Sequence, residues 1–261
     1  VLRRFPFAMQ RNATRRLGHL RSMVDPGASG LAQGLRGLSL QKKKARVLCL
    51  HGYENSGPIL KKQLQMGGWI KEFGDLCDFV FVSAPFTSVP PVTPIVQEFF
   101  PDDPKRQWFE RIEHLESGGV RYVGLDKGFA EVSRALREDG PFDGVLGFSQ
   151  GAGMSLYTIA KQQRGELLPA GIPSKLKFAV IIAGFRPRDL ENRALFEGVE
   201  LDTPTCHIWG EHDVLKYKSE ECTRSCRDPL VLRHGSGHKV PKVDTFEANR
   251  LRAFIREACL L

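Results

Sequence analysis

Short apolar runs alternate with helical stretches from Arg46 onward. The apolar runs occupy residues 47–50, 79–82, 142–148, 178–183, 205–209 and 230–232. Helical spacing of apolar and polar residues covers residues 59–73, 123–137 and 246–259, and another helix begins within residues 154–161. Continuous apolar runs are typical of parallel strands that are buried on both faces. The pattern therefore predicts an α/β fold, with a mostly parallel central sheet and helices on both faces.

A proline-rich segment over residues 87–104 interrupts this alternation. Its five prolines are Pro90, Pro91, Pro94, Pro101 and Pro104. Proline fixes φ and lacks a backbone donor, so this spacing argues against any regular element. Long irregular segments inside compact domains are usually functional. We therefore expect a loop or a lid here.

The composition is that of an ordinary globular protein, with 41% hydrophobic and 26% charged residues among 261. No run of 18 or more apolar residues occurs, so we expect no stable membrane insertion. The six cysteines include no C-x-x-C pair and are too sparse for a disulfide scaffold, which favours reduced thiols. The chain also lacks G-x-G-x-x-G and Walker motifs and a zinc-ligand cluster, so no cofactor or metal is implied.

Positive charge is concentrated at the start of the chain. Residues 1–46 hold 11 Lys and Arg residues against Asp25 alone, whereas residues 47–261 hold 27 against 29 Asp and Glu residues, a net charge of −2. The larger part therefore gives no indication of nucleic-acid binding. An Arg-rich, acid-poor start is typical of an organelle transit peptide or a disordered tail, and a translational start at Met9 or Met23 is the alternative. We expect a leader over residues 1–44, a folded domain over residues 45–261, and a cytoplasmic or, with a transit peptide, a mitochondrial or plastid location.

The strongest chemical motif is Gly147-Phe148-Ser149-Gln150-Gly151, which lies between a predicted strand and a predicted helix. The pattern G-x-S-x-G is weak alone, but a sharp strand-to-helix turn needs glycines where a Cβ would collide with neighbouring backbone. Such a turn exposes the serine hydroxyl at the sheet edge and directs the helix N-terminus at a reacting carbonyl. The motif predicts that Ser149 is a nucleophile.

A nucleophilic serine needs a histidine base and an acid, which in this architecture follow later strands in the order Ser, acid, His. Asp213 and Glu211 compete as the acid after the run 205–209; Asp213 lies further past the strand end and is preferred. His238 competes with His234 and His212. We choose His238, because it lies in a glycine-containing loop, whereas His234 is at the strand end and His212 is beside the acid.

A tetrahedral oxyanion then needs two backbone N–H donors. Gln150 directly follows the nucleophile and supplies one of them. The second is expected from the loop 51–57 after the first strand, where the N–H of Tyr53 is the preferred donor. Without the other residues, this loop would be interpreted as a simple strand-to-helix turn.

These residues belong to a set of motifs that together resemble the FSH serine hydrolase family, which includes the ovarian-cancer-associated-gene-2 type esterases. The motifs are Leu50-His51-Gly52, Trp108-Phe109, Pro141-Phe142-Asp143-Gly144 before the Ser149 turn, and Gly237-His238-Lys239-Val240-Pro241. The resemblance covers roughly residues 45–258. It implies an α/β-hydrolase fold, carboxylesterase activity on acyl esters, and a triad that by position is Ser149, Asp213 and His238. Relatives often have a proline shortly after the acid, and Val214-Leu215-Lys216 departs from that pattern.

The resulting hypothesis is a serine esterase for a small-molecule acyl ester, in which Ser149 attacks, His238 moves the proton and Asp213 orients His238. Acyl-protein thioesterase or lysophospholipase activity is the alternative among enzymes, because those enzymes share a Gly-Phe-Ser-Gln-Gly turn. A non-catalytic scaffold is the alternative from another class. Apolar side chains of the proline-rich segment, above all Phe99 and Phe100, together with Trp108, are predicted to line an acyl pocket; sealing the core is their alternative role. The sequence leaves the oligomeric state open.

Overall fold

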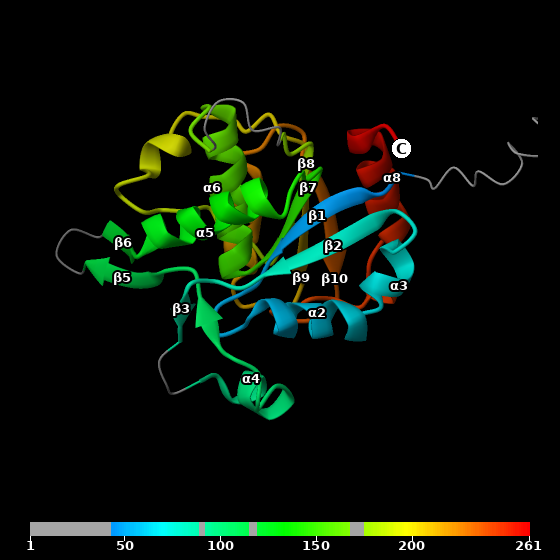
Figure 1. The fold of residues 1–261 in the computed structure, drawn as a ribbon, viewed down its shortest axis with the longest axis horizontal. Coiled ribbons are helices and arrows are strands. Elements are labelled where there is room, and N and C mark those ends of the chain that lie inside the picture. The colour runs from blue at the N-terminus through cyan, green and yellow to red at the C-terminus, as the bar shows by residue number, and fades with distance from the viewer. Residues whose placement is uncertain (1–42, 89–91, 115–118, 168–174) are drawn as a thin grey trace, which may run out of the picture. The chain divides into compact units, whose positions relative to one another are not determined.

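The computed structural model describes residues 43–88, 92–114, 119–167 and 175–261 (Figure 1). The leader predicted over residues 1–44 therefore lies outside the described residues, apart from Lys43 and Lys44. Residues 43–261 form one compact unit. No helix within the described ranges has the length and apolar character needed to cross a membrane.

A six-stranded parallel sheet forms the centre of this unit, in the order β10-β9-β8-β7-β1-β2. All six predicted apolar runs contribute a strand, and the predicted α/β fold is confirmed. The strands are β1 (Ala45–Leu50), β2 (Cys77–Val82), β7 (Gly144–Phe148), β8 (Phe178–Ile182), β9 (Thr205–Gly210) and β10 (Leu230–His234).

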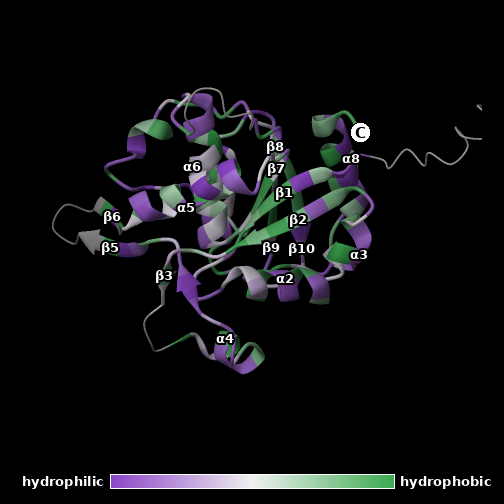
Figure 2. Cartoon of the chain, in the orientation of Figure 1, coloured by the Kyte–Doolittle hydropathy of each residue, from purple (hydrophilic) through white to green (hydrophobic). Residues whose placement is uncertain are grey.

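Helices cover both faces of the sheet, which explains the continuous apolar runs. Side chains of successive strand residues point to opposite faces, so in β1 Val47 and Cys49 join one hydrophobic cluster, and Leu48 and Leu50 join the other. One cluster also contains side chains of α2 (Gly57–Met66), α3 (Trp69–Phe73) and α8 (Ala248–Cys259). The other contains those of α5 (Leu125–Glu138), α6 (Gln150–Gln163) and the end of α7 (Lys216–Thr223). Figure 2 shows hydrophobic residues along the central strands and hydrophilic ones on the outer sides of the helices.

The helical stretch predicted over residues 59–73 is divided into two helices. α2 ends at Met66, and Gly68 adopts a left-handed φ of 80° as the N-cap of α3. Left-handed backbone is accessible to glycine at little cost, so the chain turns here. α6 also begins earlier than predicted, directly after Ser149.

The proline-rich segment is not free of regular structure, and that prediction is wrong. It contains α4 (Pro94–Phe99), which has a proline at its start, a position that needs no backbone donor. The short strands β3 (Phe86–Thr87) and β4 (Arg106–Gln107) pair at its base. A further hairpin of β5 (Glu110–His114) and β6 (Gly119–Val123) follows, which the sequence pattern did not predict.

Candidate active site

Ser149 lies on a tight turn between the central strand β7 and helix α6. Its backbone has φ 51° and ψ −112°, and a positive φ is rare for a residue with a side chain. The neighbouring glycines allow this turn, because a Cβ on Gly151 would lie 2.1 Å from the Leu50 carbonyl oxygen, and one on Gly147 would lie 2.2 Å from the Gly151 oxygen. The turn therefore depends on glycine on both sides of the serine.

The structure brings Ser149, His238 and Asp213 together from three loops. His238 Nε2 lies 2.9 Å from Ser149 Oγ, and His238 Nδ1 lies 2.7 Å from Asp213 Oδ2. The loops follow β7, β9 and β10, so the three side chains meet at the carboxyl edge of the sheet. The Asp213 side chain is fully buried, and its other oxygen accepts a hydrogen bond from Leu215 N at 2.8 Å. Both oxygens of the carboxylate therefore have a partner, and its orientation is fixed.

The competing acid and base candidates are occupied elsewhere. Glu211 is half exposed and pairs with Lys216 and Arg233 on the surface. His212 Nδ1 contacts the Gly235 carbonyl oxygen at 2.7 Å. His234 is buried, and its Nδ1 accepts from Ser236 N, while burial lowers its pKa. None of the three lies in the hydrogen-bonded chain from Ser149 to Asp213.

The two predicted oxyanion donors both border the cavity beside Ser149. Neither the N–H of Gln150 nor that of Tyr53 donates a hydrogen bond within the described residues. Gln150 N–H is at the first turn of α6, where a helix leaves backbone donors without partners. The Tyr53 side chain itself is 46% exposed. Both N–H groups are therefore available to an anion at this place.

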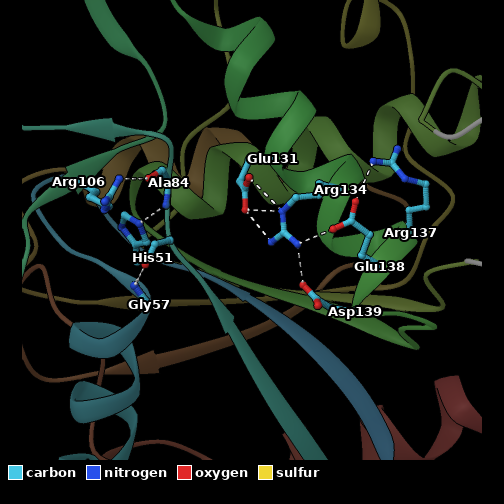
Figure 3. Close-up of polar contacts among 10 residues, drawn as sticks. His51, Gly57, Ala84, Arg106, Glu131, Arg134, Arg137, Glu138 and Asp139 are labelled. Atoms are coloured by element: carbon cyan, nitrogen blue, oxygen red, sulfur yellow. Dashed lines mark hydrogen bonds and ion pairs between the residues drawn. The ribbon is translucent and has the colours of Figure 1, made fainter.

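His51 fixes the loop that carries Tyr53. Its ring is fully buried; Nε2 accepts from Ala84 N at 2.9 Å (Figure 3), and Nδ1 contacts the Gly52 oxygen at 2.7 Å. Burial lowers the pKa of His51 to about 4, so the ring is neutral at pH 7. With the proton on Nδ1, each ring nitrogen satisfies a backbone group. Arg106 donates to the Ala84 oxygen at 3.2 Å from the other side, which ties the base of the α4 segment to the same point.

The Gln150 side chain joins the turn at Ser149 to the β4–β5 connection. Its Oε1 accepts from Trp108 N, and its Nε2 donates to the Phe109 carbonyl oxygen, both at 2.8 Å. Gln150 is buried, with only 7% of the residue exposed. Sequence reasoning considered only the backbone N–H of this residue, and no local signal in the sequence identifies its side-chain partners.

A cavity of about 490 Å³ opens beside Ser149 and His238. Its apolar lining includes Phe109, Val120, Tyr122, Ala183, Phe185 and Leu215, and its charged lining includes Glu110, Arg111, Arg186, Arg188, Lys218 and Glu221. These residues come from the β5–β6 hairpin, the loop after β8, and the region of α7. The hairpin and the loop after β8 were not singled out in the sequence.

The aromatic residues predicted as the acyl pocket do not line this cavity. Trp108 is fully buried, with Nε1 donating to the His51 oxygen at 2.9 Å and its ring 5.3 Å from the His51 ring. Phe99 is 56% exposed on α4, and Phe100 is buried at the end of that helix. Trp108 therefore belongs to the core below the site, and its neighbours Gln107 and Phe109 take the lining positions.

Among the described residues, no group of three or more His, Cys, Asp or Glu side chains is placed to hold a metal ion. The six cysteines are all buried and unpaired by disulfides. Burial raises the pKa of Cys77 to about 12 and that of Cys226 to about 11, so both thiols are protonated at pH 7.

A family profile and individual relatives both place the chain in one protein family. The profile of the serine hydrolase (FSH1) family matches residues 40–249. An esterase of Caenorhabditis elegans is 32% identical over 222 residues, which cover 82% of this chain and 94% of the relative. Esterase OVCA2 of Danio rerio is 29% identical, covering 75% of this chain and 90% of the relative.

Solved structures show the same fold. SOBER1 of Arabidopsis thaliana superimposes with a TM-score of 0.53 at 19% identity, covering 83% of this chain and all of that chain. Esterase PE8 superimposes with a TM-score of 0.52 at 23% identity, covering 82% and 93%. The arrangement of parallel strands and covering helices is thus that of the α/β hydrolases.

Proposed function

Because the chain belongs to the FSH1 serine hydrolase family and is an ester hydrolase, we propose that it is a carboxylesterase with a Ser149–His238–Asp213 triad. The observation that carries this proposal is the continuous chain of short contacts, 2.9 Å from serine to histidine and 2.7 Å from histidine to aspartate. The side chains come from three separate loops, and a core-packing requirement alone does not explain their alignment.

The contacts support the proton positions that the reaction needs. The buried carboxylate of Asp213 accepts the Nδ1–H of His238, which leaves Nε2 without a proton and able to accept the one on Ser149 Oγ. Ser149 then attacks the ester carbonyl, and the imidazolium that forms is stabilised by Asp213. The N–H groups of Gln150 and Tyr53 bind the oxyanion.

Collapse of the tetrahedral intermediate releases the alcohol, which takes its proton from His238 Nε2. The acyl group stays on Ser149 Oγ as an acyl-enzyme. Water then attacks this ester with His238 again as the base, and the carboxylic acid is released. No step requires a group beyond these residues and water.

Replacement of the nucleophile tests the proposal. Ser149→Ala is expected to lower kcat on p-nitrophenyl acetate by about 10⁶-fold, since the triad acts as a unit, and to abolish labelling by a fluorophosphonate probe. Ser133→Ala is the matched control, because Ser133 hydrogen-bonds the Leu167 carbonyl oxygen away from the cavity lining. Activity of the Ser149 variant within tenfold of the unmodified protein would refute the assignment.

Ester and thioester hydrolysis are separated by comparing substrates that differ only in the leaving atom, oxygen or sulfur. An oxygen ester and a thioester of the same acyl chain are assayed with the same protein. We expect the higher kcat/KM for the oxygen ester. The reverse order would identify a thioesterase that uses the same three residues.

A further inference from the structure

The catalytic cavity carries more positive than negative charge. Among the residues that the structure describes, the cations Arg111, Arg186, Arg188 and Lys218 line it, whereas only two carboxylates do, Glu110 and Glu221. This balance is opposite to that of residues 47–261 as a whole, whose net charge is −2. The positive charge is therefore a property of the cavity and does not reflect a generally basic domain.

Two of these cations, Arg186 and Lys218, have no carboxylate partner among the described residues, whereas Arg188 has one. Glu221 forms an ion pair with Arg188, with Oε2 and Nη2 2.5 Å apart. The Arg186 guanidinium donates to the Phe196 carbonyl oxygen at 3.0 Å, and Lys218 Nζ lies 5.8 Å from the centre of the Tyr217 ring. Within the described part of the chain, neither Arg186 nor Lys218 forms an ion pair, and both are partly buried.

Arginines elsewhere in this unit show the contrast. Arg134 contacts Glu131, Glu138 and Asp139 along helix α5 and just beyond it (Figure 3), and Arg252 holds Asp75. Arg134 and Arg252 are also partly buried, with 37% and 17% of their side chains exposed, and each has a carboxylate partner. Other partly buried cations without an ion pair among the described residues, such as Arg46 and Arg106, lie outside the cavity lining. Arg186 and Lys218 are therefore the described cations without an ion pair that face a substrate in the cavity.

We propose that the ester hydrolysed at Ser149 carries a carboxylate, which Arg186 and Lys218 bind in the cavity. Guanidinium and ammonium groups form short, charge-assisted hydrogen bonds with a carboxylate. A purely alkyl acyl chain would instead remove water from both cations without replacing it, which is unfavourable. The cavity thus selects an anionic ester in two ways, by attracting the carboxylate and by disfavouring a neutral chain.

The carboxylate can belong to either half of the substrate, and the assay separates the two. In the acyl arm, mono-p-nitrophenyl adipate is compared with p-nitrophenyl hexanoate, which has the same chain length. In the leaving-group arm, 3-carboxyphenyl hexanoate is compared with phenyl hexanoate. Hydrogen bonds to charged groups predict that kcat/KM is roughly tenfold to hundredfold higher for the anionic member of one arm.

Variants of Lys218 connect the preference to the cavity. Lys218→Met keeps the apolar stem and removes the charge, so the ratio of anionic to neutral kcat/KM should fall about tenfold, while Lys218→Arg keeps it. Lys216→Met is the control, because Lys216 is on the same helix but pairs with Glu211 outside the cavity lining. The ratio is measured on one sample, so partial unfolding of a variant does not alter it. Arg186→Gln provides a second, independent test.

This inference rests on the proposed function, but the two fail differently. The carboxylate proposal is overturned if the protein hydrolyses neutral esters and the fluorophosphonate probe labels Ser149, while the ratio of anionic to neutral kcat/KM is at or below one in both arms. The proposed esterase function would remain in that case. A preference that Lys218→Met leaves unchanged also overturns the carboxylate proposal. If no ester in either arm is hydrolysed by the unmodified protein, the proposed function itself fails.

Discussion

Replacement of Gln150 by methionine isolates the effect of a side chain that supports the cavity wall. Methionine has a similar length and leaves the backbone N–H in place, but it makes neither of the two 2.8 Å contacts with Trp108 N and the Phe109 oxygen. Each buried polar group left without a partner costs about 1–3 kcal/mol, so the loss should be about 2–6 kcal/mol. Since 1 kcal/mol shifts Tm by roughly 2–4 °C for a unit of this size, Tm should fall by at least about 4 °C.

Helix α6 provides a matched control at its other end. Gln162 makes the same two-bond contact with one backbone segment, accepting from Leu176 N at 2.7 Å and donating to the Leu176 oxygen at 3.0 Å. Gln162→Met should therefore also lower the free energy of unfolding. Only Gln150→Met should lower kcat/KM, by roughly tenfold or more, because Phe109 lines the cavity and small displacements there misplace the substrate.

Urea unfolding followed by tryptophan fluorescence gives the stability of each variant. Hydrolysis of p-nitrophenyl hexanoate, measured well below the lower Tm, gives its activity. If the two variants lose similar stability and both keep full kcat/KM, the Gln150 side chain is only a structural contact and our reasoning about the cavity wall is wrong.

Two further predictions concern ionisable residues. Asp213→Asn should lower kcat by about 10⁴-fold, because asparagine stabilises the wrong tautomer of His238. Glu211→Gln should leave kcat near its normal value. If steady-state assays show the larger loss for Glu211→Gln, Glu211 and not Asp213 is the acid. Burial lowers the pKa of His51 to about 4 and that of His207 to about 3, from 6.5. Their contribution to stability is therefore complete above pH 6.5 and is lost as the pH falls toward these values, by about 3 kcal/mol for His51. Urea unfolding at pH 7 and pH 4.5 should show this loss, and His207→Leu should make it smaller; an identical pH dependence in that variant would contradict the explanation.

The central sheet could be predicted because its strands are buried on both faces. A strand such as β8, with five buried residues in a row, leaves an unbroken apolar run in the sequence. The β5–β6 hairpin leaves no such run, since charged residues such as Glu110, Arg111 and Arg121 alternate with apolar ones outside the main sheet. The same reasoning missed α4, because a proline count does not distinguish a proline inside a helix from one at its first turn.

The positions of Ser149, Asp213 and His238 could be inferred because each follows a predicted strand, and the carboxyl ends of parallel strands meet at one edge. The lining of the cavity follows no such rule. Trp108 and Phe109 are adjacent and both aromatic, yet only Phe109 lines the cavity. That difference depends on the contacts between Trp108 and His51, two residues that are 57 positions apart in the sequence.

The strands that precede Ser149 and His238 are synthesised at different times. Ser149 follows the central strand β7, whereas His238 follows the edge strand β10, and 89 residues separate them. A ribosome adds about 5–20 residues per second, so roughly 4 to 18 seconds pass between the synthesis of the serine and that of its base. In the proposed mechanism, Ser149 lacks its proton acceptor during this interval. With the proposed triad, esterase activity therefore begins only when β10 has joined the sheet and the loop that carries His238 is in place.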